Sequence, residues 1–141
     1  MDLKNYLAVS GLPGIYRMVA SRNNGLIIED LDDGKRRFVS SRKHQFTPLE
    51  SIAIYTDDGD STELKNVFNN MLEQLEDNPP VKANAKNEEL KEYFADVLPT
   101  YDEDRVHVGD IKKVIKWFSF MHSRQLLTTQ DDPVADQSEE E

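Results

Sequence analysis

The sequence predicts an α+β protein with a small antiparallel β-barrel at 1–56, a three-helix bundle at 57–127 and a disordered acidic tail at 128–141. Three observations predict this fold. The first part carries short β-branched and aromatic runs separated by turn signals. After Asp57, apolar residues recur at the three- and four-residue spacing of a helix face. The last fourteen residues contain six acids and no bases, a composition typical of disorder.

The barrel is predicted from four runs that have the composition of strands. They are LPGIYRMVAS at 12–21, LIIEDL at 26–31, RRFVSS at 36–41 and SIAIYT at 51–56. Asn24-Gly25 and Asp33-Gly34 are expected to supply the positive φ of tight hairpin turns. A short helix at about 3–9 is expected to plug an open end, and TPLE at 47–50 reads as a single turn. Because so few short strands must curl to bury one face and protect their edges, an SH3-like barrel is expected.

The helices are predicted from apolar residues that share one face in each of three segments. The first face comprises Leu64, Val67, Phe68, Met71, Leu72 and Leu75. The second, within 87–98, comprises Leu90, Tyr93, Phe94, Val97 and Leu98. Asp60 or Ser61 is expected to cap the first helix, and Asp110 is expected to cap a third that runs to about 127. Each stripe must be buried against its neighbours, which predicts a bundle.

Composition limits the classes of function. The 141 residues carry a net charge of −10 and no cysteine, which excludes disulfides, thiolate catalysis and cysteine-based zinc sites. No secretory signal and no membrane-spanning apolar run is found, so a cytoplasmic location without membrane partners is expected. The charge is +2 over 1–56, −6 over 57–127 and −6 over 128–141. This distribution is not typical of a protein that binds nucleic acid along its whole length.

The order of these features also supports a resemblance. The hairpin-rich head with SGLPGIY at 10–16, followed by a helical part with DEDRVHVGDIKKVIKWF at 102–118, resembles a family of small bacterial proteins of unknown function. The resemblance covers nearly the whole chain except the tail. It implies an SH3-like N-terminal part, and it implies no catalytic residues.

A cluster of cations in DGKRRFVSSRKHQF, residues 33–46, is one candidate binding surface. Strand alternation places Arg36 and Phe38 on one face and Arg37 on the other, so either Phe38 or the following Val39 is expected to be exposed. With Arg42 and Lys43, an exposed ring between guanidinium groups would suit single-stranded RNA. Alternatively, Arg36 and Arg37 pair internally with Glu29, Asp30, Asp32 and Asp33 across the hairpin.

The predicted third helix carries a second candidate surface. Trp117 lies at the edge of its apolar face, and Phe120 lies on the far side among Lys113, Lys116 and Arg124. A ring among bases on a solvated face docks on the barrel, meets another subunit, or serves as a binding platform with cation–π character.

No constellation in the sequence indicates catalysis, a metal or a cofactor. The acidic segments at 57–60 and 101–110 do not fit a calcium loop. They are better explained by the helices that follow, because acidic side chains are stabilised near the positive N-terminal end of a helix dipole. The three histidines are far apart, and His122 is expected in the core of the third helix. The glycines form no phosphate-binding loop.

These patterns together predict a protein that is not an enzyme. The leading hypothesis is an adaptor that binds a protein partner or a second copy of itself, through the aromatic-rich barrel surface or the Trp117 and Phe120 side of the third helix. The alternative is binding of single-stranded RNA through the basic hairpin.

Overall fold

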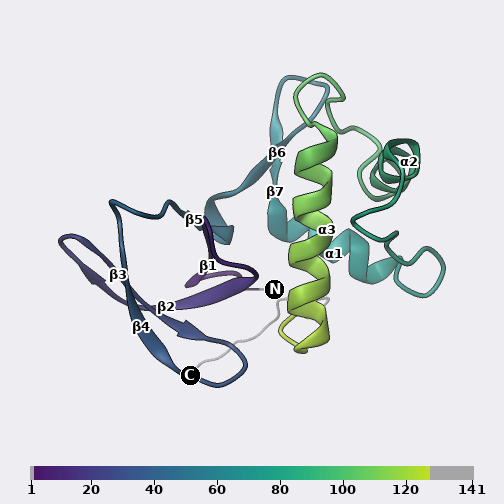
Figure 1. The fold of residues 1–141 in the computed structure, drawn as a ribbon. Coiled ribbons are helices and arrows are strands. Elements are labelled where there is room, and N and C mark those ends of the chain that lie inside the picture. Colours follow the sequence, from purple (N-terminus) through teal and green to yellow (C-terminus); the bar gives the residue numbers. More distant parts are fainter. Residues whose placement is uncertain (1, 128–141) are drawn as a thin grey trace, which may run out of the picture. The chain divides into compact units, whose positions relative to one another are not determined.

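The computed structural model describes residues 2–127, which form two compact units. One unit is Leu3–Ile52, and the other is the described part of Ala53–Glu141 together with Asp2. The first contains a five-stranded sheet and the second contains three helices, which confirms the α+β class (Figure 1). The tail predicted at 128–141 to be disordered lies outside the described residues.

The first unit is a single antiparallel sheet with strand order β4-β3-β2-β1-β5. Its elements are β1 Tyr6–Val9, β2 Ile15–Arg22, β3 Gly25–Asp30, β4 Arg36–Ser40, β5 Phe46–Pro48 and the short 3₁₀ helix η1 Leu49–Ser51. The sheet is not closed into a barrel: β4 and β5 form its two edges and are not paired with each other in the described chain.

Alternation along the strands builds the core of this unit. Leu7, Val9, Ile28 and Val39 are buried in one cluster. Five half-buried side chains pack against them, namely Leu12, Tyr16, Met18, Leu26 and Phe46. The opposite face of the sheet is mixed: it carries the charged residues Arg17, Glu29 and Arg36 together with the apolar residues Ile15, Ile27 and Phe38.

The helix expected at 3–9 is wrong, because Tyr6–Val9 forms β1. This strand lies between β2 and β5 and pairs with both, so its backbone groups find partners on both sides. Its side chains alternate between half-buried and buried. A seven-residue helix is marginal on its own, and two flanking strands stabilise the extended conformation instead.

The two predicted hairpin turns have different outcomes. Gly34 has a φ of 72°, which confirms the left-handed turn at Asp33-Gly34. Gly25 has no positive φ; it is the first residue of β3 and lies opposite both Arg22 and Ser40. The expectation of a positive φ at Gly25 is therefore wrong.

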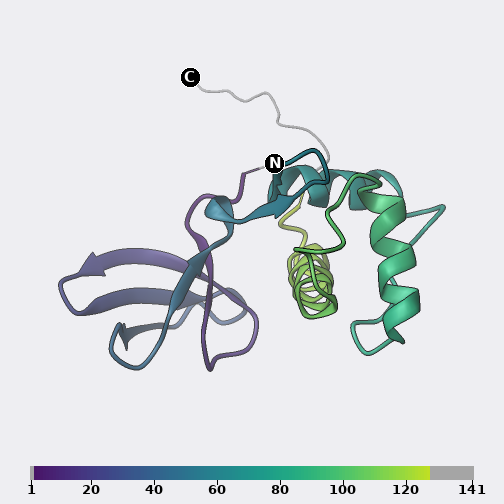
Figure 2. The ribbon, with the colours of Figure 1, turned by 90° about the horizontal axis from the view of Figure 1, so that it is seen from above.

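The second unit packs α1 Leu64–Glu73, α2 Asn87–Val97 and α3 Val108–Ser123 around a shared core. Figures 1 and 2 show the three helices running in different directions, with α3 seen nearly end-on in Figure 2. The Phe68 and Phe118 rings meet edge to face with centroids 5.8 Å apart, which joins α1 to α3. Every residue predicted on the first two helix faces is buried or half-buried. The helical period therefore identified the core of this unit correctly.

The run at 51–56 is a strand, but it does not belong to the first sheet. Its central part, β6 Ala53–Tyr55, pairs with β7 Ser61–Glu63 in a separate two-stranded sheet of the second unit. The Asp102 N–H donates to the Tyr55 carbonyl oxygen at 2.9 Å on the other side of β6. Both edges of β6 thus find partners within the helical unit.

Four further expectations about the helices are wrong: the caps of α1 and α3, the end of α3 at about 127, and the burial of His122. Helix α3 begins at Val108 and ends at Ser123, so Asp110 lies in its first turn, where its carboxylate accepts the His107 N–H at 3.0 Å. Helix α1 has Glu63 at its N-cap, and no side chain caps it. His122 is exposed instead of buried, with its ring stacked on Phe118 at 5.5 Å.

The Tyr93 hydroxyl on α2 is buried and has no hydrogen-bond partner among the described residues. Burial raises the pKa of Tyr93 well above its usual value near 10. Because the pKa of Tyr93 is higher in the folded than in the unfolded chain, its titration leaves the full stability of the protein in place below pH 10 and lowers the free energy of unfolding as the pH rises further.

We expect Tyr93→Phe to raise the free energy of unfolding by about 1 kcal/mol, because it removes a buried hydroxyl that lacks a partner. Urea unfolding at pH 7 and at pH 10.5 measures the effect. The variant should also lose less stability than the parent between these two pH values. A destabilised variant would show instead that the hydroxyl has a partner such as a buried water.

Candidate functional site

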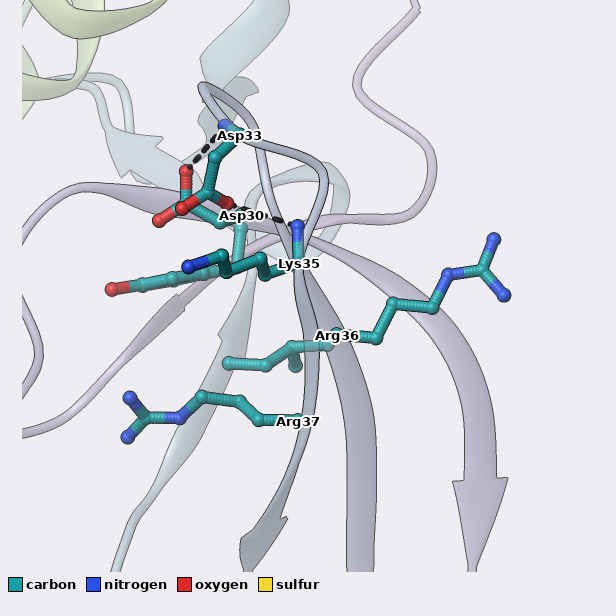
Figure 3. A pocket seen from close by; sticks show the side chains of 7 residues that line it. Asp30, Asp33, Lys35, Arg36 and Arg37 are labelled. Atoms are coloured by element: carbon teal, nitrogen blue, oxygen red, sulfur yellow. Dashed lines mark hydrogen bonds between the residues drawn. The ribbon is translucent and has the colours of Figure 1, made fainter.

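A pocket of about 170 Å³ opens at the β3–β4 turn of the first unit. We call it the hairpin pocket. It is lined by Tyr16, Ile28, Asp30, Asp33, Lys35, Arg36 and Arg37 (Figure 3). Tyr16 and Ile28 belong to the packed face of the sheet, and the other lining residues come from the end of β3, the turn and the start of β4. The pocket therefore combines an apolar wall with a charged rim.

The two acids of the pocket build the turn. The Asp30 carboxylate accepts the N–H groups of Asp32 at 2.8 Å and Asp33 at 3.3 Å. The Asp33 carboxylate accepts the Lys35 N–H at 2.9 Å. These are the local side-chain to backbone bonds by which aspartate stabilises turns. Both carboxylates thus have a structural role.

The three cations of the pocket point in two directions. Figure 3 shows Lys35 and Arg37 extending to one side of β4 and Arg36 to the other. Arg36 donates to Glu29 at 3.2 Å, so the predicted internal pairing is observed for Arg36. Within residues 2–127 neither Lys35 nor Arg37 forms an ion pair. Both cations remain available to a ligand.

Of the two apolar residues on β4, Phe38 is the exposed one. Its side chain is 44% exposed, whereas Val39 is 3% exposed and belongs to the core. The Phe38 ring also lies against Gly25 on the adjacent strand. Phe38 therefore covers a glycine in the sheet and is not a fully free stacking platform.

Arg42 and Lys43 lie in the turn that follows β4, at the opposite end of the strand from Lys35. The turn is held by Ser40, whose hydroxyl oxygen accepts the Arg42 N–H at 3.1 Å and whose carbonyl accepts the Lys43 N–H at 3.2 Å. Both side chains are exposed. Cations thus flank β4 at both ends.

The outer face of the sheet carries one row of paired polar side chains in register. Tyr6 lies opposite Arg17, Arg17 opposite Glu29, and Glu29 opposite Arg36. The Arg17 guanidinium lies 5.4 Å from the Tyr6 ring centroid. Each member of this row has a neighbour of complementary charge or polarity, so the row favours stability over ligand binding.

The second predicted surface lies on α3 and is partly self-satisfied. Trp117 and Phe120 are half-buried, and Lys113 is exposed. The Arg124 guanidinium carbon is 3.5 Å from the Phe120 ring centroid, and Arg124 also donates to the Phe120 carbonyl at 3.0 Å. The predicted cation–π interaction is therefore made within the protein, between Arg124 and Phe120 at the end of α3. This contact leaves less of the Phe120 ring for a partner.

Tyr55 is an exposed aromatic residue that the sequence reasoning missed. It is 48% exposed, and Arg105 lies over its ring at 5.0 Å while also pairing with Asp102 at 3.8 Å. Alternation within β6, where Ile54 is buried and its neighbours are exposed, is the signal that identifies it.

The acidic segment at 57–60 has a structural explanation. The Asp58 carboxylate accepts the Thr56 hydroxyl at 2.6 Å and the Asp60 N–H at 3.0 Å. These bonds lower the pKa of Asp58.

Among residues 2–127 no three acidic or histidine side chains are placed to hold a metal ion. In the same range no helix is long and apolar enough to cross a bilayer.

Comparison with known proteins finds two matching family models. Residues 3–49 match Domain of unknown function (DUF5606), and residues 52–121 match Domain of unknown function (DUF6852). Along the chain, the change from one family model to the other, between residues 49 and 52, lies close to the boundary of the two compact units between Ile52 and Ala53. No curated protein matches the chain.

A solved structure is also similar over the whole chain. It is the solution NMR structure of a Bacteroides vulgatus protein, a target of the Northeast Structural Genomics Consortium. The two sequences are 32% identical, the alignment covers 99% of each chain, and the TM-score is 0.70.

Proposed function

We propose that this chain, which belongs to a family with DUF5606 in its N-terminal part and DUF6852 in its C-terminal part, is a non-catalytic binding protein of the cytoplasm. The partner is a protein that presents an acidic segment to the hairpin pocket. In this proposal the curved sheet of Leu3–Ile52 acts as an SH3-like module, and the Trp117 and Phe120 side of α3 is a secondary contact surface.

One observation supports this proposal above the others. Lys35 and Arg37 extend to the same side of β4, next to Tyr16 and Ile28, and neither cation is paired within the described residues. A glutamate whose carboxylate reaches these two cations can place its aliphatic stem against the wall of the pocket. An acidic segment of a protein offers this combination of charge and apolar surface.

We expect the double variant Lys35→Ala and Arg37→Ala to weaken binding to an acidic peptide about tenfold. Each lost charge-assisted contact at a partly solvated site contributes about 1 kcal/mol or less, and two together approach a factor of ten. Fluorescence anisotropy with a labelled peptide that alternates Glu and Thr measures the dissociation constant. The matched control is Lys91→Ala with Lys116→Ala, which removes two exposed cations from the helical unit.

The control should bind like the parent, and a peptide with Lys in place of Glu should not bind. Equal losses in both double variants would show that attraction depends only on overall charge, and this would contradict a site at the pocket. An unbiased pull-down, with and without nuclease, then tests whether the captured partner is a protein.

A second candidate function is binding of single-stranded RNA through Arg36, Arg37, Phe38, Arg42 and Lys43. The partial exposure of Phe38 on the Arg36 side of β4 favours it. Binding of a mixed oligonucleotide would then fall steeply with salt and drop in Arg36→Ala with Arg37→Ala. The opposite directions of Arg36 and Arg37 weigh against this candidate, since one strand of RNA then meets only part of the set.

A further inference from the structure

We infer that the partner binds as an added β-strand along the free edge of β4, so that main-chain hydrogen bonds supplement the charge contacts at the hairpin pocket. The occupant is an extended acidic segment of a protein. This inference rests on the proposed function and specifies how the partner is held.

The hydrogen bonds that flank the hairpin determine which backbone groups of β4 are free. The Asp30 N–H donates to the Lys35 carbonyl at 2.8 Å, and the Ser41 N–H donates to the Asn24 carbonyl at 2.9 Å. In an antiparallel pair such hydrogen-bonded positions recur at every second residue. Together with the observed register, they direct the N–H and C=O groups of Arg37 and Val39 toward β3.

The intervening positions consequently point their backbone groups away from β3. Arg36 and Phe38 each present an N–H and a C=O group to the open edge, and Ser40 presents an N–H. None of these five groups has a hydrogen-bond partner in the described part of the chain. The Ser40 carbonyl, by contrast, accepts the N–H groups of Lys43 and His44. A row of free donors and acceptors of this kind is a template for another strand.

The other edge of the sheet is much less suited to strand addition. Strand β5 has three residues, and the Ser10 N–H donates to the Gln45 carbonyl at 2.9 Å, which places Phe46 and Pro48 at the outward positions. Proline has no N–H to offer. Phe46 is therefore the one residue of β5 with a complete outward pair, and β4 is the favoured edge.

The charge on β4 indicates the chemistry of the occupant. Lys35, Arg36 and Arg37 lie at one end of the strand, and Arg42 and Lys43 follow its other end. Two copies of β4 paired edge to edge would bring four guanidinium groups of Arg36 and Arg37 to one seam, which opposes self-association. An acidic strand meets complementary charge at both ends, and every second side chain faces Lys35 and Arg37 beside the pocket.

Amide hydrogen exchange followed by NMR tests this inference with internal controls on the same strand. The full-length protein is measured alone and with the peptide that alternates Glu and Thr. The amides of Arg36 and Phe38 should exchange at least tenfold more slowly with the peptide. The amides of Arg37 and Val39 already bond to β3 and should change little.

Two isomeric peptides provide a second test that does not require a folded variant. One is N-methylated at every Glu and the other at every Thr, so each lacks alternate N–H donors. Strand addition predicts that one isomer loses at least tenfold in affinity while the other binds like the unmodified peptide. Phe38→Pro compared with Phe38→Ala adds a protein-side control, since both lack the ring and only proline blocks the outward N–H.

The outcomes separate the two proposals. If no acidic peptide binds, the proposed function itself fails. If the peptide binds in a Lys35- and Arg37-dependent manner, but Arg36 and Phe38 gain no protection and both methylated isomers bind equally, strand addition is wrong and the pocket proposal stands. If the Phe38 amide is protected in the protein alone, and the protection increases with protein concentration, the edge of β4 pairs with a second copy of the chain. That result would contradict the inference that an acidic segment is the partner.

Discussion

Gly25→Ala is expected to destabilise the first unit by about 3 kcal/mol or more and to disrupt the β3–β4 hairpin. A Cβ atom at this position would overlap the Val39 carbonyl oxygen and press on the Phe38 ring. The first obstacle is backbone of a paired strand, so relief requires separation of the strands and not a side-chain rotation. The hairpin pocket would be lost together with the hairpin.

Gly34→Ala is the matched control for this variant. No atom lies within 4 Å of its added Cβ, and the strain comes from its φ of 72°, so a loss of only about 1–2 kcal/mol is expected. NMR spectra and amide exchange at Ile28 and Val39 follow the hairpin in both variants. A Gly25→Ala variant with native exchange at these sites would show that β4 does not approach β3 as closely as described.

Phe118→Ala is expected to reduce the free energy of unfolding of the helical unit by about 3–5 kcal/mol. Phe118 is 1% exposed, packs edge to face on Phe68 of α1 and is stacked by the His122 ring. Truncation leaves a cavity where α1 meets α3. Against a total of about 5–15 kcal/mol for a domain, this loss leaves the unit marginal.

Phe120→Ala on the same helix is the control. Its ring is half-buried and contacts the Arg124 guanidinium, so a loss of about 1 kcal/mol or less is expected. Urea unfolding followed by the fluorescence of Trp117, the single tryptophan of the chain, reports on α3 in both variants. Similar losses for the two substitutions would contradict the assignment of Phe118 to the core and of Phe120 to the surface.

Much of the candidate site follows from local sequence rules. Strand alternation predicts opposite directions for Arg36 and Arg37, and Figure 3 shows this arrangement. It also predicts one exposed residue between Phe38 and Val39. It does not decide which one, because that choice depends on whether Val39 meets the core cluster with Leu7 and Ile28. The pairing of Arg36 with Glu29, and the free state of Arg37, likewise depend on the register of β3 against β4.

Gly25 illustrates how the role expected for a residue from its sequence neighbours can differ from its role in the folded sheet. Next to Asn24, a glycine indicates a turn residue with positive φ. Its backbone instead has ordinary strand geometry, and its missing side chain allows Val39 and Phe38 to approach. No local pattern contains that information, because the close contact forms only when β4 pairs with β3.

By itself, the sequence determined the features that repeat at short range. These are the change from strand to helical period, the buried faces of α1 and α2, the turn at Gly34 and the placement of cations at both ends of β4. Tertiary structure alone decided that Tyr6–Val9 is a strand, that Ala53–Tyr55 joins the helical unit, and that β4 lies at an open edge. The reason is physical: an extended segment satisfies its backbone hydrogen bonds with residues distant in the chain, whereas a helix satisfies them within four residues.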